Sequence, residues 1–267
     1  MDHTYWHRQQ VDKPLFPDLL WSRPEHKTQA GKLGIIGGNA HGFSAAAEAY
    51  AVATKSGIGS ARVLLPNSLQ KTVGRIFQAG EYAPSTPSGS FSQTALSEML
   101  ELSQWSDGML VAGNLGHNSE TAIALEQFTQ KYTLQLTLCG DSIDYFLSQP
   151  ADILQRQETL LALTLSQLQK LTSAAKFTQA FTSQMGLMKL VDNLHEFTTL
   201  YKAYIIMALD DNIIVSVDGQ VSTTKYEDSI SDEISIAAKA SVWWLQNPSK
   251  SFEAITSSVA VDANEVS

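Results

Sequence analysis

Asp232 is the acidic residue whose surroundings point most directly to chemistry. It follows Ser229-Ile230-Ser231 and opens an apolar stretch, residues 232–245, that is predicted to be a helix. One interpretation is structural: a serine caps the helix, and Asp232 and Glu233 interact favourably with the helix dipole. The other is catalytic, with Asp232 as a general base that accepts a proton from a substrate hydroxyl. The residues around Asp232 leave both open.

Two glycine-rich segments follow predicted strands and are candidates for ligand contact. Gly37-Gly38-Asn39-Ala40-His41-Gly42 precedes a predicted helix, whose unpaired N–H groups can hold an anion. The segment lacks the G-x-G-x-x-G spacing of dinucleotide-binding folds, so a turn that needs positive φ explains it equally well. Gly113-Asn114-Leu115-Gly116 is expected at the same edge of a parallel sheet. Both interpretations stay open for these loops, whose candidate ligand contacts are Gly37, Gly38, Asn39, Gly113, Asn114 and Gly116.

Other reactive side chains give weaker signals. Asp141 follows a predicted strand, so its carboxylate can start a helical turn or accept a hydrogen bond from a ligand hydroxyl. His117 is expected at the surface, because the sequence supplies no definite partner for a histidine base. The six histidines are scattered and Cys139 is the one cysteine, so no metal site is predicted. A metal requirement would have to come with a nucleotide.

A parallel sheet is needed to bring these loops together. Residues 32–66 have the pattern of a strand, a glycine turn, an alanine-rich helix over Ser44–Lys55, a second glycine turn and a second strand, which is a βαβ unit. Further strands are predicted at 108–112, 133–138, 160–163, 203–209 and 212–217, with helices at 94–105, 119–131, 166–173 and 232–245. Asp218-Gly219 predicts a hairpin turn, and residues 83–92 a Pro/Gly/Ser-rich connection. The alternation predicts a doubly wound α/β sandwich with its ligand crevice beyond the carboxyl ends of the strands.

Composition and charge narrow the class of protein. The 267 residues are 43% hydrophobic and 17% charged, which favours one α/β domain over 1–267, with residues 1–30 as an arm packed on the body and 250–267 as a C-terminal tail. A net charge of −9 without a Lys/Arg cluster argues against nucleic acid as a partner. No apolar stretch approaches the roughly 20 residues that cross a bilayer. Without a secretory signal pattern or a second cysteine, a cytoplasmic protein is expected.

Taken together, these segments resemble the ADP/ATP-dependent NAD(P)H-hydrate dehydratases of the ribokinase-like superfamily. His26-Lys27, Gly37-Gly38-Asn39 and Gly57-Ile58-Gly59 stand where that family has its Arg…His-Lys segment, its Gly-Gly-Ser turn and a Gly-x-Gly strand start. Gly113 to Gly116 is similar to its Gly-Pro-Gly-Leu-Gly loop, with Asn114 intruding. Asp141 matches the second aspartate of its Asp-Ala-Asp-Ala-Leu-Asn segment, and Cys139 replaces the first. The resemblance implies a three-layer ribokinase-like sandwich with a mostly parallel sheet, and a homo-oligomer.

Later motifs of that family are eroded here. Its Thr-Pro-His-Pro-Gly-Glu segment corresponds loosely to residues 162–167, its Lys-Gly pair falls at Met207-Ala208, and its Gly-Ser-Gly-Asp anion hole is Ser229-Ile230-Ser231-Asp232. Glycines in such a hole let backbone N–H groups approach a transferring phosphoryl group closely, and loss of one donor typically costs about 2.7–4 kcal/mol of transition-state stabilisation. A serine hydroxyl could partly replace a lost donor.

The resemblance implies a carbon–oxygen lyase that repairs hydrated nicotinamide cofactors with ATP or ADP and Mg²⁺. Asp232 would be the base that activates the substrate hydroxyl for phosphorylation, Ser229, Ile230 and Ser231 would form the anion hole, and Asp141 would support the crevice. The two glycine-rich segments would contact the substrate. One alternative is a catalytically degenerate ribokinase-like protein that binds a nucleotide-like ligand or a partner without turnover. A third hypothesis is a small-sugar or vitamin kinase that uses the same aspartate.

Overall fold

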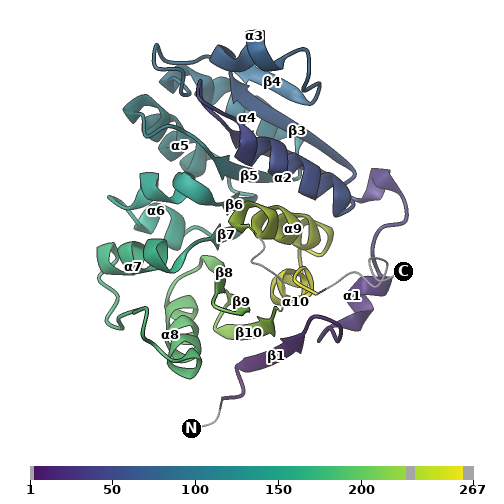
Figure 1. The fold of residues 1–267 in the computed structure, drawn as a ribbon, viewed down its shortest axis with the longest axis vertical. Helices are drawn as coiled ribbons and strands as arrows, with labels where there is room; N and C mark the ends of the chain where they lie inside the picture. The colour runs from purple at the N-terminus through teal and green to yellow at the C-terminus, as the bar shows by residue number, and fades with distance from the viewer. Residues whose placement is uncertain (1–2, 227–231, 261–267) are drawn as a thin grey trace.

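A ten-stranded mixed sheet forms the middle layer of the molecule, with helices on both faces (Figure 1). The computed structural model describes residues 3–226 and 232–260. In sheet order the strands are β1 (Trp6–Gln10), β10 (Gln220–Lys225), β9 (Asn212–Val217), β8 (Tyr204–Leu209), β7 (Thr159–Ala162), β6 (Gln135–Leu138), β5 (Gly108–Gly113), β2 (Lys32–Gly37), β3 (Ser60–Pro66) and β4 (Gly80–Ala83). Among the described strands, the β8–β9 and β9–β10 pairs are antiparallel and the others parallel. The predicted, mostly parallel α/β sheet is confirmed.

The helices divide between the two faces of the sheet. They are α1 (Pro17–Trp21), α2 (Ser44–Lys55), α3 (Gln70–Val73), α4 (Leu96–Trp105), α5 (Ser119–Lys131), α6 (Ala151–Leu154), α7 (Leu165–Ala174), α8 (Leu187–Leu200), α9 (Glu233–Gln246) and α10 (Ser251–Ser257). Helices α4 to α8 pack on one face, and α2, α9 and α10 on the other. Because both faces are covered, adjacent strand residues such as Ile35 and Ile36 are both buried, in opposite cores.

Helix α2 owes its position to small side chains. Its buried residues are alanines. Gly37 of β2 lies so close to the helix that a Cβ added to this glycine would be 3.1 Å from the Cβ of Ala46. This close approach seats α2 against β2, and α2 packs beside α9 on the same face. Both helices begin at the carboxyl ends of the parallel strands, so their N-termini lie at one edge of the sheet.

The N-terminal arm contributes a strand, which the sequence pattern did not indicate. Strand β1 pairs in parallel with β10 at the edge of the sheet, from Trp6 opposite Val221 to Gln10 opposite Lys225. Its sequence, WHRQQ, has neither an apolar run nor a regular alternation, because an edge strand needs little buried side-chain area. Backbone pairing therefore defines this strand where periodicity could not.

Residues expected in the C-terminal tail form part of the body up to residue 260. Helix α10 buries Ala254 and Ile255, and Thr256 lies in the same buried turn. The segment is short and built of small residues, so its burial gives little helical periodicity. Residues 261–267 lie outside the described part of the chain. Within the described residues, no helix has the length and apolar character needed to span a membrane.

Candidate functional site

Two neighbouring hollows open at the carboxyl edge of the sheet, around the start of α9. The first, which we call the α2 hollow, has a volume of about 310 Å³. It is lined by Ser44, Ala45, Glu48, Ala112, Asn114, Gly140, Asp141, Asp232 and Ile234. The second, which we call the β8 hollow, has a volume of about 250 Å³. It is lined by Ala162, Leu163, Thr164, Ile206, Met207, Ala208, Asp232, Glu233 and Ile236.

Asp232 lies at the junction of the two hollows. It is the residue immediately before α9, with φ −53° and ψ 143°, and its side chain makes no capping hydrogen bond to the helix. The carboxylate is exposed and lines both hollows. The side chain is therefore available to a ligand in either hollow, and the predicted serine cap lies outside the described residues. The predicted anion hole, Ser229, Ile230 and Ser231, lies outside the described residues.

The two predicted glycine loops lie side by side at the rim of the α2 hollow. The backbone N–H of Gly38 donates to the carbonyl of Gly113 at 3.0 Å, and the side-chain amide of Asn39 donates to the carbonyl of Asn114 at 2.6 Å. Gly113 has φ +93°, which favours glycine, and a Cβ on it would lie 3.0 Å from a carboxylate oxygen of Asp141. Gly37, Gly38, Asn39, Gly113 and Gly116 shape this rim, whereas Asn114 lines the hollow itself.

Asn114 occupies the N-terminus of α2. Its Oδ1 accepts a hydrogen bond from the backbone N–H of Ala45 at 3.0 Å and lies 3.3 Å from the hydroxyl of Ser44, which also donates to it. Asn114 itself adopts φ +58°, a left-handed conformation that asparagine tolerates better than most residues. One N–H of the helix terminus that the sequence offered to an external anion, that of Ala45, is thus already bound by a side chain of the protein.

Asp141 is held by the backbone of the second glycine loop. The N–H of Leu115 donates to both of its carboxylate oxygens, at 3.0 and 3.3 Å. Asp141 also lines the α2 hollow, so one carboxylate both fixes the loop and faces the ligand space.

Glu233 joins the site from α9, although its sequence position suggested only an interaction with the helix dipole. Its Oε1 accepts a hydrogen bond from the N–H of Gly140 at 2.8 Å, and the side-chain amide of Gln167 donates to the carbonyl of Gly140 at 2.8 Å. Burial raises the pKa of the Glu233 carboxyl, and the hydrogen bond from Gly140 opposes that rise. Glu233 is 93 positions from Gly140 in the sequence, and Gln167 is 27 positions from it, so a local sequence pattern could not reveal these contacts.

Glu48 is a further acid of the site that sequence reasoning missed. It lines the α2 hollow, and its Oε1 accepts a hydrogen bond from the hydroxyl of Ser235 at 2.9 Å. A signal was present: Glu48 is the one charged residue in the alanine-rich segment 44–54, four positions after Ser44, so it lies on the same helix face.

The electrostatic character of the site is acidic. Burial raises the pKa of the Cys139 thiol well above its usual range, and the charges of Glu233, Asp232, Asp141 and Glu48 raise it further. The thiol stays neutral, which suits its place among four carboxylates. Among the residues that the structure describes, no lysine, arginine or histidine lines either hollow. In those same ranges no three His, Cys, Asp or Glu side chains are placed to hold a metal ion.

The β8 hollow has a largely apolar lining. Among its described residues the one hydroxyl side chain, that of Thr164, caps α7: it accepts a hydrogen bond from the N–H of Gln167 at 3.2 Å and forms a capping box. Thr164 therefore stabilises the start of this helix. Met207 and Ala208 stand where the resemblance implied a Lys-Gly pair. Lys55 and Lys239 line a separate hollow of about 200 Å³ beside α2 and α9.

His117 and Arg23 lie apart from the two hollows. His117 is exposed and stacks on Tyr145 at 6.1 Å between ring centroids, as its predicted surface position implies. Arg23 packs at the opposite end of α2, where its guanidinium donates to the carbonyl of Ser56 and lies 4.8 Å from the ring of Trp243. Neither residue lines the α2 or the β8 hollow.

Comparison with solved structures supports the architecture. The chain is similar to a ribokinase-like superfamily protein from Enterococcus faecalis, with TM-score 0.71 and 14% identity, over 97% of this chain and 86% of that one. A hypothetical protein from Streptococcus mutans matches with TM-score 0.69 and 14% identity, over 92% and 86% of the two chains. An ADP/ATP-dependent NAD(P)H-hydrate dehydratase from Bacillus subtilis, co-crystallised with ATP and Mg²⁺, matches with TM-score 0.63 and 11% identity, over 94% and 87%.

Sequence comparison adds nothing to these structural matches. No sequence model of a protein family matches the chain, and no curated protein sequence does. At 11–14% identity the structural likeness speaks for the fold, and it covers more than nine-tenths of the chain. The sheet order, the covered faces and these matches together show that the chain has the ribokinase-like α/β fold.

Proposed function

We propose that the protein is a nucleotide-dependent enzyme that dehydrates hydrated nicotinamide cofactors, an ADP/ATP-dependent NAD(P)H-hydrate dehydratase. The observation that carries the proposal is the position of Asp232, exposed at the start of α9 and shared by the α2 and β8 hollows. A base between two ligand spaces is the arrangement that transfer of a phosphoryl group from a nucleotide to a hydroxyl requires. The Bacillus subtilis dehydratase with the same fold was crystallised with ATP and Mg²⁺.

In this proposal Asp232 accepts the proton of the substrate hydroxyl while the hydroxyl oxygen forms a bond to the terminal phosphorus of the nucleotide. The bond from that phosphorus to the leaving nucleotide oxygen breaks. The carbon–oxygen bond of the new phosphate ester then breaks with release of phosphate, while the adjacent ring carbon loses a proton to solvent, which restores the double bond of the reduced nicotinamide. Asn114 and Asp141 would contact the substrate in the α2 hollow. Mg²⁺ would arrive with the nucleotide, since the described residues offer no cluster of three ligands for it.

An absorbance assay tests the proposal. Purified protein, ATP or ADP, Mg²⁺ and NADH hydrate should regenerate the absorbance of reduced nicotinamide, and Asp232→Asn should lower kcat/KM by about 10²–10⁴-fold. Asp18→Asn is a suitable control because Asp18 is also a first-turn acid, in α1, and lines neither hollow. Absence of any regeneration beyond that of Asp232→Asn would reject this activity.

A second candidate function is binding of a nucleotide-like ligand without turnover. The specific observation in its favour is the lining of the β8 hollow, in which Met207 stands among apolar side chains and the described residues supply no cation for a polyphosphate. Residues 227–231, Glu-Asp-Ser-Ile-Ser, add no basic side chain by sequence. A ligand that binds the folded state raises the unfolding midpoint with its concentration. Stabilisation by NAD⁺ or NADH but not by ATP, with no turnover, would favour this candidate.

A further inference from the structure

Three backbone N–H groups at the rim of the α2 hollow, those of Ala45, Leu115 and Gly140, are already bound by side chains of the protein. Asn114 Oδ1 accepts from the N–H of Ala45, Asp141 accepts from Leu115, and Glu233 accepts from Gly140. Such N–H groups at loop and helix starts are the usual means of holding a phosphate. A phosphate that used these three N–H groups would have to displace an amide or a carboxylate that is bound to them at 2.8–3.0 Å.

The charge of the lining acts in the same direction. Glu48, Asp141 and Asp232 line the α2 hollow, and the described lining contains no basic side chain to balance them. These carboxylates act together on the buried thiol of Cys139: after burial itself, the charges of Glu233 and of the three carboxylates raise the pKa of the thiol. An anionic group that enters the hollow is therefore repelled and a cation is attracted. An uncharged group is neither repelled nor attracted by these charges.

Polar side chains of the hollow suit a hydroxylated group. The lining offers the hydroxyl of Ser44, the amide of Asn114 and several carboxylate oxygens. Carboxylates accept hydrogen bonds strongly from hydroxyls, and a site built to pair with hydroxyl groups discriminates against analogues that lack them. The volume of the hollow, about 310 Å³, equals that of roughly ten water molecules in the liquid. This space is enough for a nucleoside, a sugar that carries one base, but not for a whole dinucleotide.

We infer that the α2 hollow selects its ligand by charge: it takes an uncharged or cationic, hydroxylated nucleoside end and keeps the phosphates of the same ligand outside. Glu48 and Asn114 are the specificity-determining residues. The inference rests on the proposed function only in the choice of nicotinamide riboside as that nucleoside.

Unfolding midpoints measured with two related probes test the inference. Nicotinamide riboside should raise the midpoint of the wild-type protein with an apparent Kd at least about tenfold lower than that of its 5′-phosphate, because the added phosphate meets uncompensated carboxylates. Equal or tighter binding of the 5′-phosphate would overturn the inference, and so would the absence of any shift with the riboside.

Two variants should change this preference in opposite directions. Glu48→Gln keeps an acceptor for Ser235 but removes a charge, so the preference for the riboside should shrink. Asn114→Asp keeps an acceptor for Ala45 and adds a charge, so the preference should grow. Glu98→Gln, on α4 and outside the α2 hollow, should leave it unchanged. Unchanged ratios in both site variants would overturn the assignment of Glu48 and Asn114.

The outcomes separate this inference from the proposed function. Riboside selectivity without regeneration of reduced nicotinamide would reject the enzyme and keep the charge selection. Regeneration together with equal binding of the two probes would keep the enzyme and reject the charge selection.

Discussion

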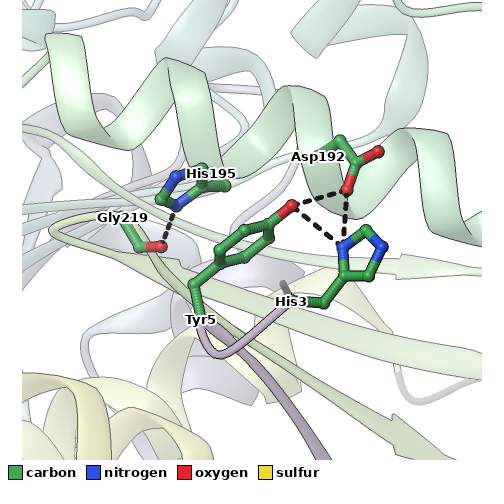
Figure 2. Close-up of polar contacts among 5 residues, drawn as sticks. All are labelled: His3, Tyr5, Asp192, His195 and Gly219. Atoms are coloured by element: carbon green, nitrogen blue, oxygen red, sulfur yellow. Dashed lines mark hydrogen bonds and ion pairs between the residues drawn. The ribbon is translucent and has the colours of Figure 1, made fainter. Parts of the chain in front are cut away.

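Two polar clusters in this molecule differ in how many acidic side chains they gather and in what lies beside those acids. Around the N-terminal strand, the hydroxyl of Tyr5 donates to Asp192 at 2.7 Å, and the Tyr5 ring stacks on His195 at 3.7 Å (Figure 2). His195 in turn donates from Nδ1 to the carbonyl of Gly219 at 2.5 Å. This cluster, which we call the β1 anchor, ties residues before β1 to α8 and to the hairpin between β9 and β10.

At the carboxyl edge of the sheet several acids lie together, and the described lining of the two hollows contains no basic side chain. Asp232 is exposed without a capping bond, and one oxygen of Asp144 is buried with no hydrogen-bond partner among the described residues. Burial raises the pKa of the Glu233 carboxyl, and neighbouring charges on Asp232 and Asp144 raise it further. Clustered acids without a neighbouring basic side chain reduce stability and are typical of sites that bind or react, whereas hydrogen-bonded groups such as those of the β1 anchor contribute to stability.

The sharpest test of this contrast is Asp232→Asn, which should separate activity from stability. Turnover of NADH hydrate should fall by about 10²–10⁴-fold, while the free energy of unfolding should stay within about 0.5 kcal/mol of wild type because the side chain is exposed and caps nothing. Denaturant titration and the absorbance assay on one preparation check both. A large loss of stability would place Asp232 with the structural residues instead.

Among the substitutions in and around strand β1, Gln9→Ala should lower the free energy of unfolding most. Its buried amide donates to Thr224 Oγ1 and to the carbonyl of Thr256, and its Oε1 accepts from the N–H of Leu15. Truncation leaves these buried groups unpaired, at a cost of about 1–3 kcal/mol. Denaturant unfolding measures the loss, with the exposed neighbour Gln10→Ala as the matched control. Equal effects of the two substitutions would contradict the role given to Gln9.

Tyr5→Phe should cost less, about 0.5–1.5 kcal/mol, because it removes one hydrogen bond and keeps the ring stacked. The bond to Asp192, followed by burial, raises the pKa of Tyr5 to about 12 from the ordinary 10.0. A raised pKa means that the folded state favours the neutral phenol, so this stabilisation is complete below pH 10 and is lost as the pH rises toward 12. The difference in unfolding midpoint between wild type and variant should therefore shrink over that interval. A constant difference would show that Tyr5 does not titrate there.

Glu233→Gln should have the smallest effect, and of opposite sign. Burial raises the pKa of this carboxyl above 4.5, so the stability linked to its protonated form is present at acidic pH and is lost as the pH rises through the folded-state pKa. Glutamine keeps an acceptor for the N–H of Gly140 without the charge. The variant should therefore unfold at a slightly higher temperature than wild type at pH 7 and at the same temperature near pH 4. A lower midpoint at pH 7 would mean that the charge of Glu233 stabilises the fold.

The central part of the fold could be predicted from sequence because its signals are local. Strand β2, the alanine-rich α2 and the turn at Asp218-Gly219 lie where apolar runs, small residues and turn residues placed them. Helix α8 was missed although its buried face follows a helical repeat, from Leu190 and Leu194 to Phe197. Strand β1 was beyond such reasoning, because its partner in the sheet is more than 200 residues away.

The candidate site divides in the same way. Asp232, Asn114 and Asp141 follow predicted elements, and the parallel sheet brings them to one hollow. The sequence did not show that the N–H of Ala45 is bound by Asn114, which is 69 residues away along the chain. Nor did it show that the N–H of Gly140 is bound by Glu233, which is 93 residues away. Pattern can locate the carboxyl edge of a sheet, but it cannot tell which of the N–H groups there are already taken.

The pairing of β1 with β10 constrains how the chain is completed during synthesis. Residues 6–10 leave the ribosome before their partner, residues 221–225, which emerges more than 200 residues later. At about 5–20 residues per second, β1 waits on the order of ten to forty seconds with its backbone unpaired. Its polar sequence, Trp-His-Arg-Gln-Gln, suits such a delay, because a charged and amide-rich strand has little tendency to associate with other nascent chains.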